Sequence, residues 1–391
     1  MVKCIHGVLF LMSFATLFSC GKLSVDDSQS MIPIDFSVSD YTAEVKGSSL
    51  TTDNISNFGV FAAMESDKDG GFSEINASDL ELFMDNVSIV KDASGNWSAN
   101  PPHYWPLLAD KSLSFFAYAP YSTSADMEVV AGWGNDEGQN YKNVRISYSL
   151  DSNPANHVDL CVARAVPDRN RFDDTDSDGI PDPVTFHFEH ILSLVSFAAN
   201  YVGTLPEGCS LVIDEVMLEN ICTSGVLLLD ASQSGAFYSW ESVSGNRDIL
   251  LSISGETLEN NVFIDKADPK QSNGNYVDFV TAKGDIFMLP QTVNPQPASA
   301  LADQDDPNIS NLAVTFSYVM TGNSGKPVVT AQFYTKMPLP TTSLMASKKT
   351  IYAFTIDVTS ASLVNLSAVT GSGWVDEWEE GESVNYPDPI K

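Results

Sequence analysis

Short stretches in which every second residue is hydrophobic recur along this chain, from residues 32–38 to residues 350–356. Successive side chains of an extended strand point to opposite faces, so this spacing predicts strands with one buried face. Glycine, asparagine, aspartate, serine and proline gather between the stretches, and these residues favour turns. A helical spacing of apolar residues occurs only at 78–84 and 191–199, where we expect short helices. The pattern predicts an all-β protein built as antiparallel β-sandwiches.

The length of 391 residues favours two domains. The most acidic, loop-like segment of the first half ends near residue 182, and the strand-like stretch after it leads into a second set of strands. We therefore expect an N-terminal β-sandwich over residues 32–187 and a C-terminal β-sandwich over residues 188–391. Residues 32–38 are the predicted first strand, and Pro33 indicates that it is an edge strand or that Pro33 stands at its start.

The first twenty residues resemble the signal peptide of a lipoprotein. Lys3 is followed by an apolar, uncharged run at residues 5–18, and Ser19 then precedes Cys20. The run is too short to span a bilayer, which favours a cleaved signal at residues 1–19. Cys20 would then carry lipid, residues 20–31 would form a tether, and only the lipid would contact the membrane. The alternative is an ordinary secretory signal with a chance cysteine.

Acidic residues dominate the charge of the chain, with 51 Asp and Glu against 20 Lys and Arg and a formal net charge of -31. Such a charge argues against nucleic acid and anionic membrane surfaces as partners. It suits a secreted protein and supplies oxygen ligands for hard cations.

Cysteine is too sparse to form a disulfide scaffold. Cys4 would leave with the signal and Cys20 would be lipidated, so Cys161, Cys209 and Cys222 remain. At most one bridge could form among these three, for example between Cys209 and Cys222. Buried free thiols are the favoured interpretation.

One acidic motif has the spacing of a calcium-binding loop. Carboxylates at alternate positions can converge on one cation, and a glycine at the sixth position permits the tight turn. The predicted calcium ligands are Asp174, Asp176, Asp178, the Ile180 carbonyl and Asp182. Thr185 occupies the twelfth position, where an EF-hand has a bidentate Glu, so the motif resembles the shorter calcium loops of extracellular proteins. The alternative is a solvated acidic turn.

Catalytic motifs are missing from the sequence, which contains no G-x-S-x-G, H-E-x-x-H, phosphate-binding glycine loop or C-x-x-C. His187 and His190 are three residues apart on a predicted strand and would point to opposite faces. His190 shares a face with Phe186 and Phe188, so we expect it to pack in the core. The sequence therefore indicates a protein that is not an enzyme and requires no cofactor, with Ca²⁺ as the one candidate ion.

Several segments together resemble the fimbrillin family, the subunits and anchors of type V pili. Each is short, but their order and spacing run through nearly the whole chain. They are Cys20, residues 34–37, residues 57–62, residues 103–106, residues 113–120, residues 188–190, residues 194–197, residues 288–291, residues 352–356 and Trp378. The resemblance implies two transthyretin-like β-sandwich domains. It also implies export as a lipoprotein to the cell outer membrane, display at the surface in a fimbrium, and a role in cell adhesion.

The resemblance also implies a way of assembly. In polymerising fimbrillins a protease cuts after a basic residue and removes the first strand, and a strand of another subunit fills the groove. The partners would be other pilus subunits, in a homo- or hetero-polymer, with a host protein or glycan as a further candidate receptor. Lys46 and Gly47 stand where the family has its cleavage site, but the family typically has Arg there, and no arginine precedes Arg145.

Two alternatives to a polymerising subunit stay open. One is an uncut pilus anchor that keeps its lipid, and the other is a surface lipoprotein that binds a glycan or host protein. The strand pattern also predicts a set of buried residues that any of these functions would share. They are Phe115, Tyr118, Phe186, Phe188, Val195, Phe197, Ile351 and Phe354.

Overall fold

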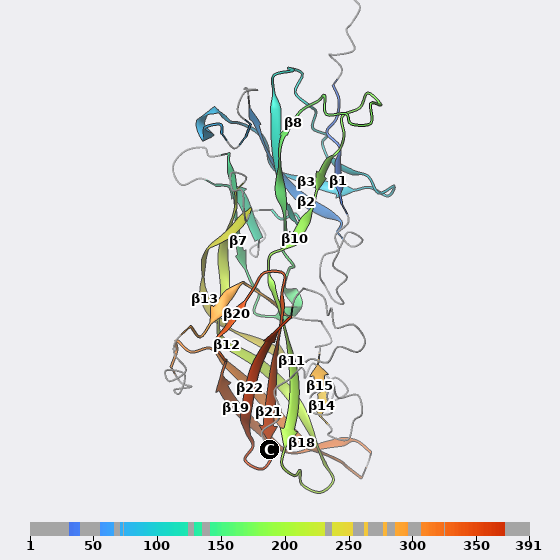
Figure 1. Ribbon diagram of the computed structural model, residues 1–391. Helices are drawn as coiled ribbons and strands as arrows, with labels where there is room; N and C mark the ends of the chain where they lie inside the picture. Colours follow the sequence, from blue (N-terminus) through green and yellow to red (C-terminus); the bar gives the residue numbers. More distant parts are fainter. Residues whose placement is uncertain are drawn as a thin grey trace, which may run out of the picture.

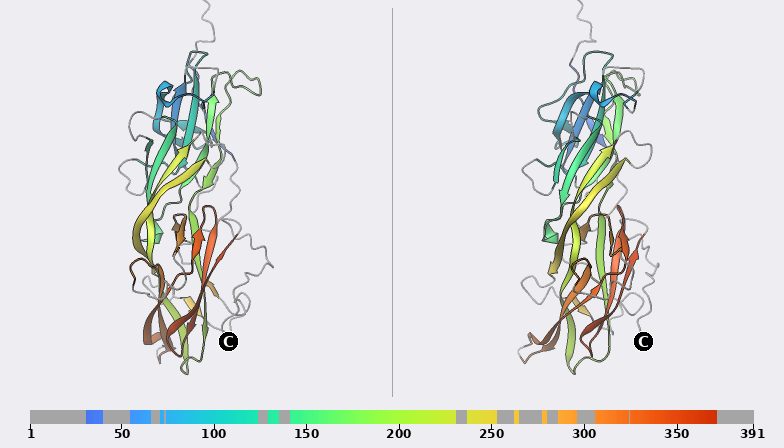
Figure 2. Two further views of the ribbon diagram at one scale, coloured as in Figure 1. Left: turned by 60° about the vertical axis from the view of Figure 1, so that its left-hand side comes forward. Right: turned by 90° about the vertical axis from the view of Figure 1, so that its left-hand side faces the viewer.

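The computed structural model shows an elongated all-β protein whose long strands run roughly along its length (Figures 1 and 2). The structure describes residues 31–39, 55–65, 71–72, 74–123, 129–134, 141–230, 237–252, 262–264, 277–279, 286–295, 306–323 and 325–371. Within these ranges the only helical segments are two single 3₁₀ turns, at Ala77–Asp79 and Pro154–Asn156. No helix in the described part of the chain is long and apolar enough to cross a membrane. The prediction of an all-β protein is confirmed.

An eight-stranded sheet forms most of the N-terminal half, in the order β10-β8-β5-β2-β3-β4-β1-β9. Its strands are β1 (Phe36–Val38), β2 (Asn57–Glu65), β3 (Glu81–Lys91), β4 (Trp97–Ala99), β5 (Ser112–Ala119), β8 (Cys161–Arg169), β9 (Val184–Phe186) and β10 (Phe188–His190). The two ends of this order, β9 and β10, are separated in the chain by His187 alone. The sheet therefore curls round on itself and encloses an aromatic core.

A seven-stranded sheet connects the two halves of the molecule. Its strands are β6 (Val129–Trp133), β7 (Asn143–Ser149), β12 (Cys209–Asp230), β13 (Tyr238–Ser252), β14 (Val262–Ile264), β18 (Asn311–Thr321) and β19 (Pro327–Pro338). β12 is 22 residues long, and it pairs with β18 near its start and with β7 near its end. Strands β6 and β7 thus belong to the predicted N-terminal domain but extend a sheet of the C-terminal half. The domain boundary between residues 187 and 188 stays a prediction, and the hydrogen bonds between β7 and β12 join strands from its two sides.

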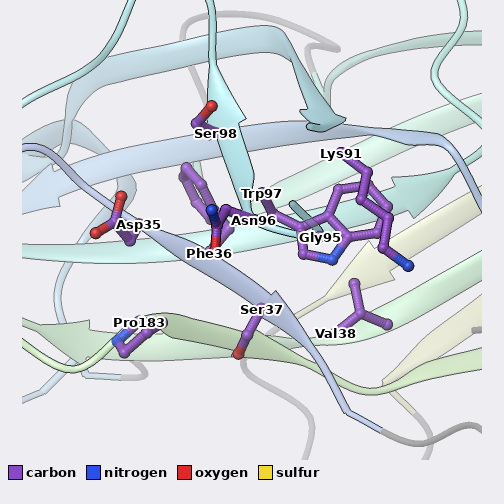
Figure 3. A pocket seen from close by; sticks show the side chains of 10 residues that line it. All are labelled: Asp35, Phe36, Ser37, Val38, Lys91, Gly95, Asn96, Trp97, Ser98 and Pro183. Carbon is purple, nitrogen blue, oxygen red and sulfur yellow. The ribbon is translucent and has the colours of Figure 1, made fainter. Parts of the chain in front are cut away.

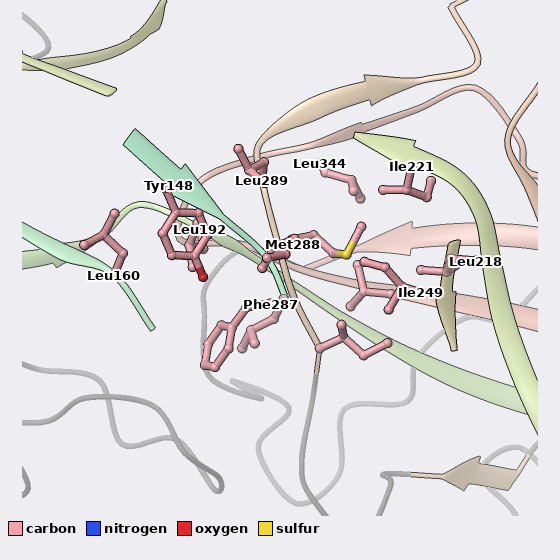
Figure 4. Close-up of a cluster of buried hydrophobic side chains, with 14 of the residues drawn as sticks. Tyr148, Leu160, Leu192, Leu218, Ile221, Ile249, Phe287, Met288, Leu289 and Leu344 are labelled. Atoms are coloured by element: carbon pink, nitrogen blue, oxygen red, sulfur yellow. The ribbon is translucent and has the colours of Figure 1, made fainter. Parts of the chain in front are cut away.

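The C-terminal half is completed by a five-stranded sheet and a two-stranded one. They contain β11 (Ser193–Val202), β15 (Val277–Phe279), β16 (Ile286–Met288), β21 (Lys349–Asp357) and β22 (Ser362–Thr370), and β17 (Gln291–Val293) with β20 (Thr342–Leu344). Most strand pairs are antiparallel, but β1 with β9 and β11 with β21 are parallel. Side chains from several sheets meet in one large buried cluster, part of which Figure 4 shows, including Tyr148, Leu160, Leu192, Ile249 and Phe287.

The buried residues expected from the sequence are confirmed, because all eight are at most 6% exposed. The two expected helices are wrong. Residues 78–84 contain the end of a 3₁₀ turn and the start of β3, and residues 191–199 lead into β11. β11 lies between β21 on one side and β15 and β16 on the other, and eight of its ten residues are buried. A strand covered on both faces shows no alternation of apolar and polar residues, so its sequence gave no period-2 signal.

Candidate functional site

The predicted first strand is held on both sides by other strands. The N–H of Val184 donates to the carbonyl of Asp35 at 2.9 Å, and the N–H of Ser39 donates to the carbonyl of Phe186 at 3.1 Å. On the other side, Phe36 is the register partner of Trp97 in β4. The strand β1 is therefore internal, and its removal would leave a slot with two unpaired edges, at β4 and at β9.

The part of the chain just before β1 is also paired. The N–H of Ile34 donates to the carbonyl of His103 at 2.8 Å, and the N–H of Trp105 donates to the carbonyl of Ile32 at 2.9 Å. Pro33 lies between them, exposed, in an isolated bridge with Tyr104. The predicted strand at residues 32–38 is shorter in the structure, because β1 begins only at Phe36 and Pro33 precedes it. The alternative of an edge strand is wrong, because β1 pairs on both sides.

The apolar side of this segment enters the aromatic core of the eight-stranded sheet. Ile34 and Phe36 are 2% and 4% exposed. The ring of Phe36 lies 6.4 Å from that of Phe58, 6.1 Å from that of Phe115 and 6.2 Å from that of Phe186, between centroids. Aromatic pairs at these distances contribute beyond the burial of their area. Phe36 is thus the main anchor of β1.

The polar side of β1 makes specific contacts with the neighbouring strand. The hydroxyls of Ser37 and Thr185 are 2.7 Å apart, and the hydroxyl of Ser39 is hydrogen-bonded to Nδ1 of His187. A replacement strand would need small polar residues at these positions to keep the same contacts.

A hollow of about 620 Å³ opens beside the end of β1 (Figure 3). Phe36, Ser37 and Val38 line one side, and the turn that joins β3 to β4 lines the other. The Lys91 ammonium lies 5.4 Å from the centre of the Trp97 ring. Because β1 and β4 share the single register pair at Phe36, their separation beyond that point leaves this space open.

The predicted lipidation and cleavage residues flank the segment that contains β1 in the sequence. Cys20, Lys46 and Gly47 lie outside the described residues. The chain leaves the described part at Ser39, just after β1, and returns at Ile55, just before β2. Lys46 is therefore within the only covalent connection between β1 and the strands that follow it.

The acidic motif forms a loop between β8 and β9 that brings three of its carboxylates together. Ligand oxygens of Asp174, Asp176 and Asp182 lie within 4.8 Å of one another. Asp178 is outside this group, and its Oδ1 accepts the N–H of Ile180 at 2.8 Å. The Ile180 side chain is exposed. Three of the five predicted ligands therefore lie close together, and calcium binding stays a prediction.

The pKa values of two carboxylates in this loop, Asp174 and Asp176, shift in opposite directions. The pKa of Asp174 is lowered, chiefly because the Gly179 N–H donates to its carboxylate, at 2.9 Å. The N–H of Asp178 lowers the pKa of Asp176, but the negative charges of Asp178 and Asp174 outweigh this contact, and the net pKa of Asp176 is raised. A bound cation would relieve this repulsion.

A buried polar cluster joins β8 to β10. Nδ1 of His190 lies 2.9 Å from Oδ2 of Asp159 and 3.2 Å from Sγ of Cys161. His190 is buried, as its apolar neighbours indicated, but its pairing with Asp159 could not be read from a sequence in which the two are 31 residues apart. Burial, then the charge of Asp159, raises the pKa of the Cys161 thiol. Cys161 and Asp159 approach the same ring nitrogen, so the three groups do not form a nucleophile–base–carboxylate relay.

The two remaining cysteines are on one strand. Cys209 begins β12 and Cys222 lies 13 positions further along it, and both are free thiols. An extended chain of that length spans about 40 Å, far beyond the reach of a disulfide. The structure therefore excludes the bridge that the sequence left open. The favoured interpretation of buried free thiols holds for Cys161, whereas Cys209 and Cys222 are free but only partly buried.

Comparisons with known proteins support one family. A search of curated proteins finds no match. Among solved structures, a fimbrial protein from Bacteroides vulgatus is 17% identical, with a TM-score of 0.59 over 88% of this chain and 100% of that chain. A candidate cell adhesion protein from Bacteroides uniformis is 16% identical, with a TM-score of 0.42 over 90% and 100%. A candidate polysaccharide-binding protein from Bacteroides thetaiotaomicron is 12% identical, with a TM-score of 0.37 over 88% and 96%.

The first of these structures shows the fold, and the sequence shows the family. The fimbrillin-like family matches residues 43–378, which is most of the chain. The matching solved structures from Bacteroides vulgatus and Bacteroides uniformis are described as a fimbrial protein and as a candidate cell adhesion protein. This protein belongs to the fimbrillin-like family.

Proposed function

We propose that this protein is a structural and adhesive subunit of a type V pilus, exported as a lipoprotein and held at the outer membrane by Cys20 until it is cut after Lys46. Other pilus subunits are its partners, and they join it by strand exchange. The observation that carries this proposal is the placement of β1. It is an internal strand that contributes Phe36 to the core, and it is joined to the remaining strands only through residues 40–54.

A cut after Lys46 would make this strand a separate peptide, still bound but no longer covalent. Its loss would expose apolar side chains around the Phe36 position and leave backbone groups of β4 and β9 unpaired, each costly unless another strand fills the slot. A strand from another subunit can satisfy both needs. Because the receiving slot and the donated strand are different surfaces, repeated exchange produces an open head-to-tail chain rather than a closed dimer.

One feature favours an uncut anchor instead. The family typically has Arg at the cleavage site, and this chain has Lys46 there and no arginine before Arg145. An uncut subunit would keep both its lipid and its own β1, and it could end a pilus at the membrane but not accept a donor strand.

Lipidation is tested by fractionating cells that express Cys20→Ala. We expect the variant to move from the membrane fraction to the soluble fraction, whereas Cys222→Ala, a matched control outside the signal, stays in the membrane fraction. An unchanged distribution of the Cys20 variant would contradict the lipoprotein assignment.

Strand exchange is tested with Lys46→Arg and an arginine-specific protease. In the wild type the first such site is Arg145, so the wild type is the matched control for a cut at position 46. We expect the variant to yield a new N-terminus at Gly47, to lose the residues that precede it and to form ladders that resist SDS. A clean cut that yields only monomers would support the anchor and contradict the polymerising subunit.

A further inference from the structure

Loops from several strands meet at one end of the N-terminal half, the end remote from the C-terminal half. β5 starts there and β8 ends there, because Leu113 pairs with Arg169. The chain enters β1 at the same end, since Pro33 bridges to Tyr104 in the loop before β5. At its other end β8 pairs Cys161 with His190, after which the chain passes into β11 and the C-terminal half.

This end carries a group of exposed large apolar side chains, which we call the apolar tip. Its members come from the entry to β1, the loop before β5 and the loop after β8. They are Met31, Tyr104, Leu107, Leu108, Phe172 and Ile180. Leu107, Leu108 and Phe172 are 53%, 61% and 60% exposed. Large apolar side chains exposed together at one end of a protein mark a site of contact with a protein, a ligand or a membrane.

The position of the N-terminus indicates which phase this is. Met31 belongs to the tip, and only residues 21–30 separate it from Cys20. Ten extended residues span at most about 35 Å, so a lipid on Cys20 would confine the tip close to the bilayer. A short tether gives an effective concentration in the millimolar range, and a surface of weak intrinsic affinity would then be bound most of the time.

We propose that the apolar tip rests on the phospholipid bilayer to which Cys20 is attached, in the tethered protein before any cut. This inference builds on the proposed lipidation and replaces the expectation that only the lipid contacts the membrane. The tip inserts leucine and phenylalanine side chains at the level of the headgroups, and Tyr104 suits the same depth because its ring is apolar and its hydroxyl polar. The long axis of the protein then stands away from the membrane, with the C-terminal half outermost.

Charge limits the kind of bilayer that fits. Asp173, Asp174, Asp176, Asp178 and Asp182 lie in the same loop as Phe172 and Ile180. Carboxylates at this density are repelled by an anionic surface over roughly 8 Å at physiological salt. The tip therefore fits a zwitterionic phospholipid face, and anionic lipid weakens its contact.

The test uses residues 21–391 with an N-terminal polyhistidine tag on phosphatidylcholine vesicles that contain a nickel-chelating lipid. Because the tag supplies the tether, the result does not depend on lipidation in cells, which Cys20→Ala tests separately. Hydroxyl-radical footprinting compares tethered with free protein. We expect several-fold protection of Leu107, Leu108 and Phe172, and none of Met320, Val328 or Val329, exposed apolar residues of the β18–β19 hairpin that serve as an internal control.

The tip variant Leu107→Ser/Leu108→Ser supplies the second measurement, flotation of the untagged protein with phosphatidylcholine vesicles. We expect about a tenfold fall in the bound fraction, from the loss of two half-exposed leucines. Val328→Ser/Val329→Ser should bind as the wild type does. Equal protection of both groups of residues, or equal flotation of both variants, would overturn the proposal. Protection of Leu107, Leu108 and Phe172 in concentrated protein without vesicles would also overturn the proposal, because a second copy of the protein would then be the partner.

Discussion

Replacing Phe36 with alanine tests whether one aromatic side chain holds the first strand in place. Phe36 is 4% exposed and lies within 6.4 Å of the three rings of Phe58, Phe115 and Phe186, between centroids. An aromatic side chain buries roughly 150–250 Å², and at about 25 cal/mol per Å² its loss corresponds to about 4–6 kcal/mol. Measured truncations of buried Phe fall in the same range, about 3–5 kcal/mol.

The assay has two stages, because the side chain should matter differently before and after the chain is cut. In the intact protein, Phe36→Ala and the control Phe316→Ala, from the core of the C-terminal half, should both lower the free energy of unfolding in urea. After cleavage of the Lys46→Arg form, only Phe36→Ala should speed the release of residues 21–46, by about three orders of magnitude. Equal release rates for Phe36→Ala and Phe316→Ala would refute the role of Phe36 as the anchor of β1.

Three further predictions concern calcium, pH and thiols. Excess calcium should raise the Tm of the wild type but not that of Asp176→Asn. Asp92→Asn is the control, because the Asp92 carboxylate also accepts backbone N–H groups but lies outside the loop, and its Tm should rise as the wild type's does. A wild-type Tm that is the same with calcium and with chelator would contradict the site. Glu65 is 1% exposed, and its burial, together with the nearby Asp168 carboxyl, raises its pKa from 4.5 to about 7. Between these two pH values the native state holds a proton that the unfolded state has lost. The native state therefore loses stability as the pH rises from about 4.5 through 7. Urea midpoints at pH 5 and pH 8 should therefore show a smaller loss for Glu65→Gln than for the wild type, and equal losses would contradict the raised pKa. Thiol titration of residues 21–391 in denaturant should find all three cysteines free, with or without prior reduction, and the buried Cys161 unreactive in the native state.

The sequence predicted those strands that have one face in the core and the other in solvent or in a second layer. The alternation at residues 32–38 correctly placed Ile34 and Phe36 in the core, because the period of a strand requires it. The same logic failed at β11, where both faces are covered. The sequence pattern also did not predict the length of β12, because the pairing of β12 with strands from both halves of the chain is not a local property.

The candidate site was predictable in its residues but not in its pairing. Pro33 indicated either an edge or a strand start, and only the topology shows that β1 lies between β4 and β9. Parallel pairing of β1 with β9 joins segments about 150 residues apart, and no local pattern encodes such a contact. The acidic loop was visible as a motif, but which of its carboxylates converge depends on the backbone N–H groups that each one accepts.

The length of β12 has a mechanical consequence for a protein displayed on a cell surface. β12 runs roughly along the long axis of the molecule, with β18 paired to its first part and β7 and β13 to its later part (Figure 1). A pull between the two ends loads these ladders in shear, so many hydrogen bonds must break at once instead of opening singly from one end. Tension applied to one half is therefore carried through β12 into the other half, and the two halves resist extension as one unit.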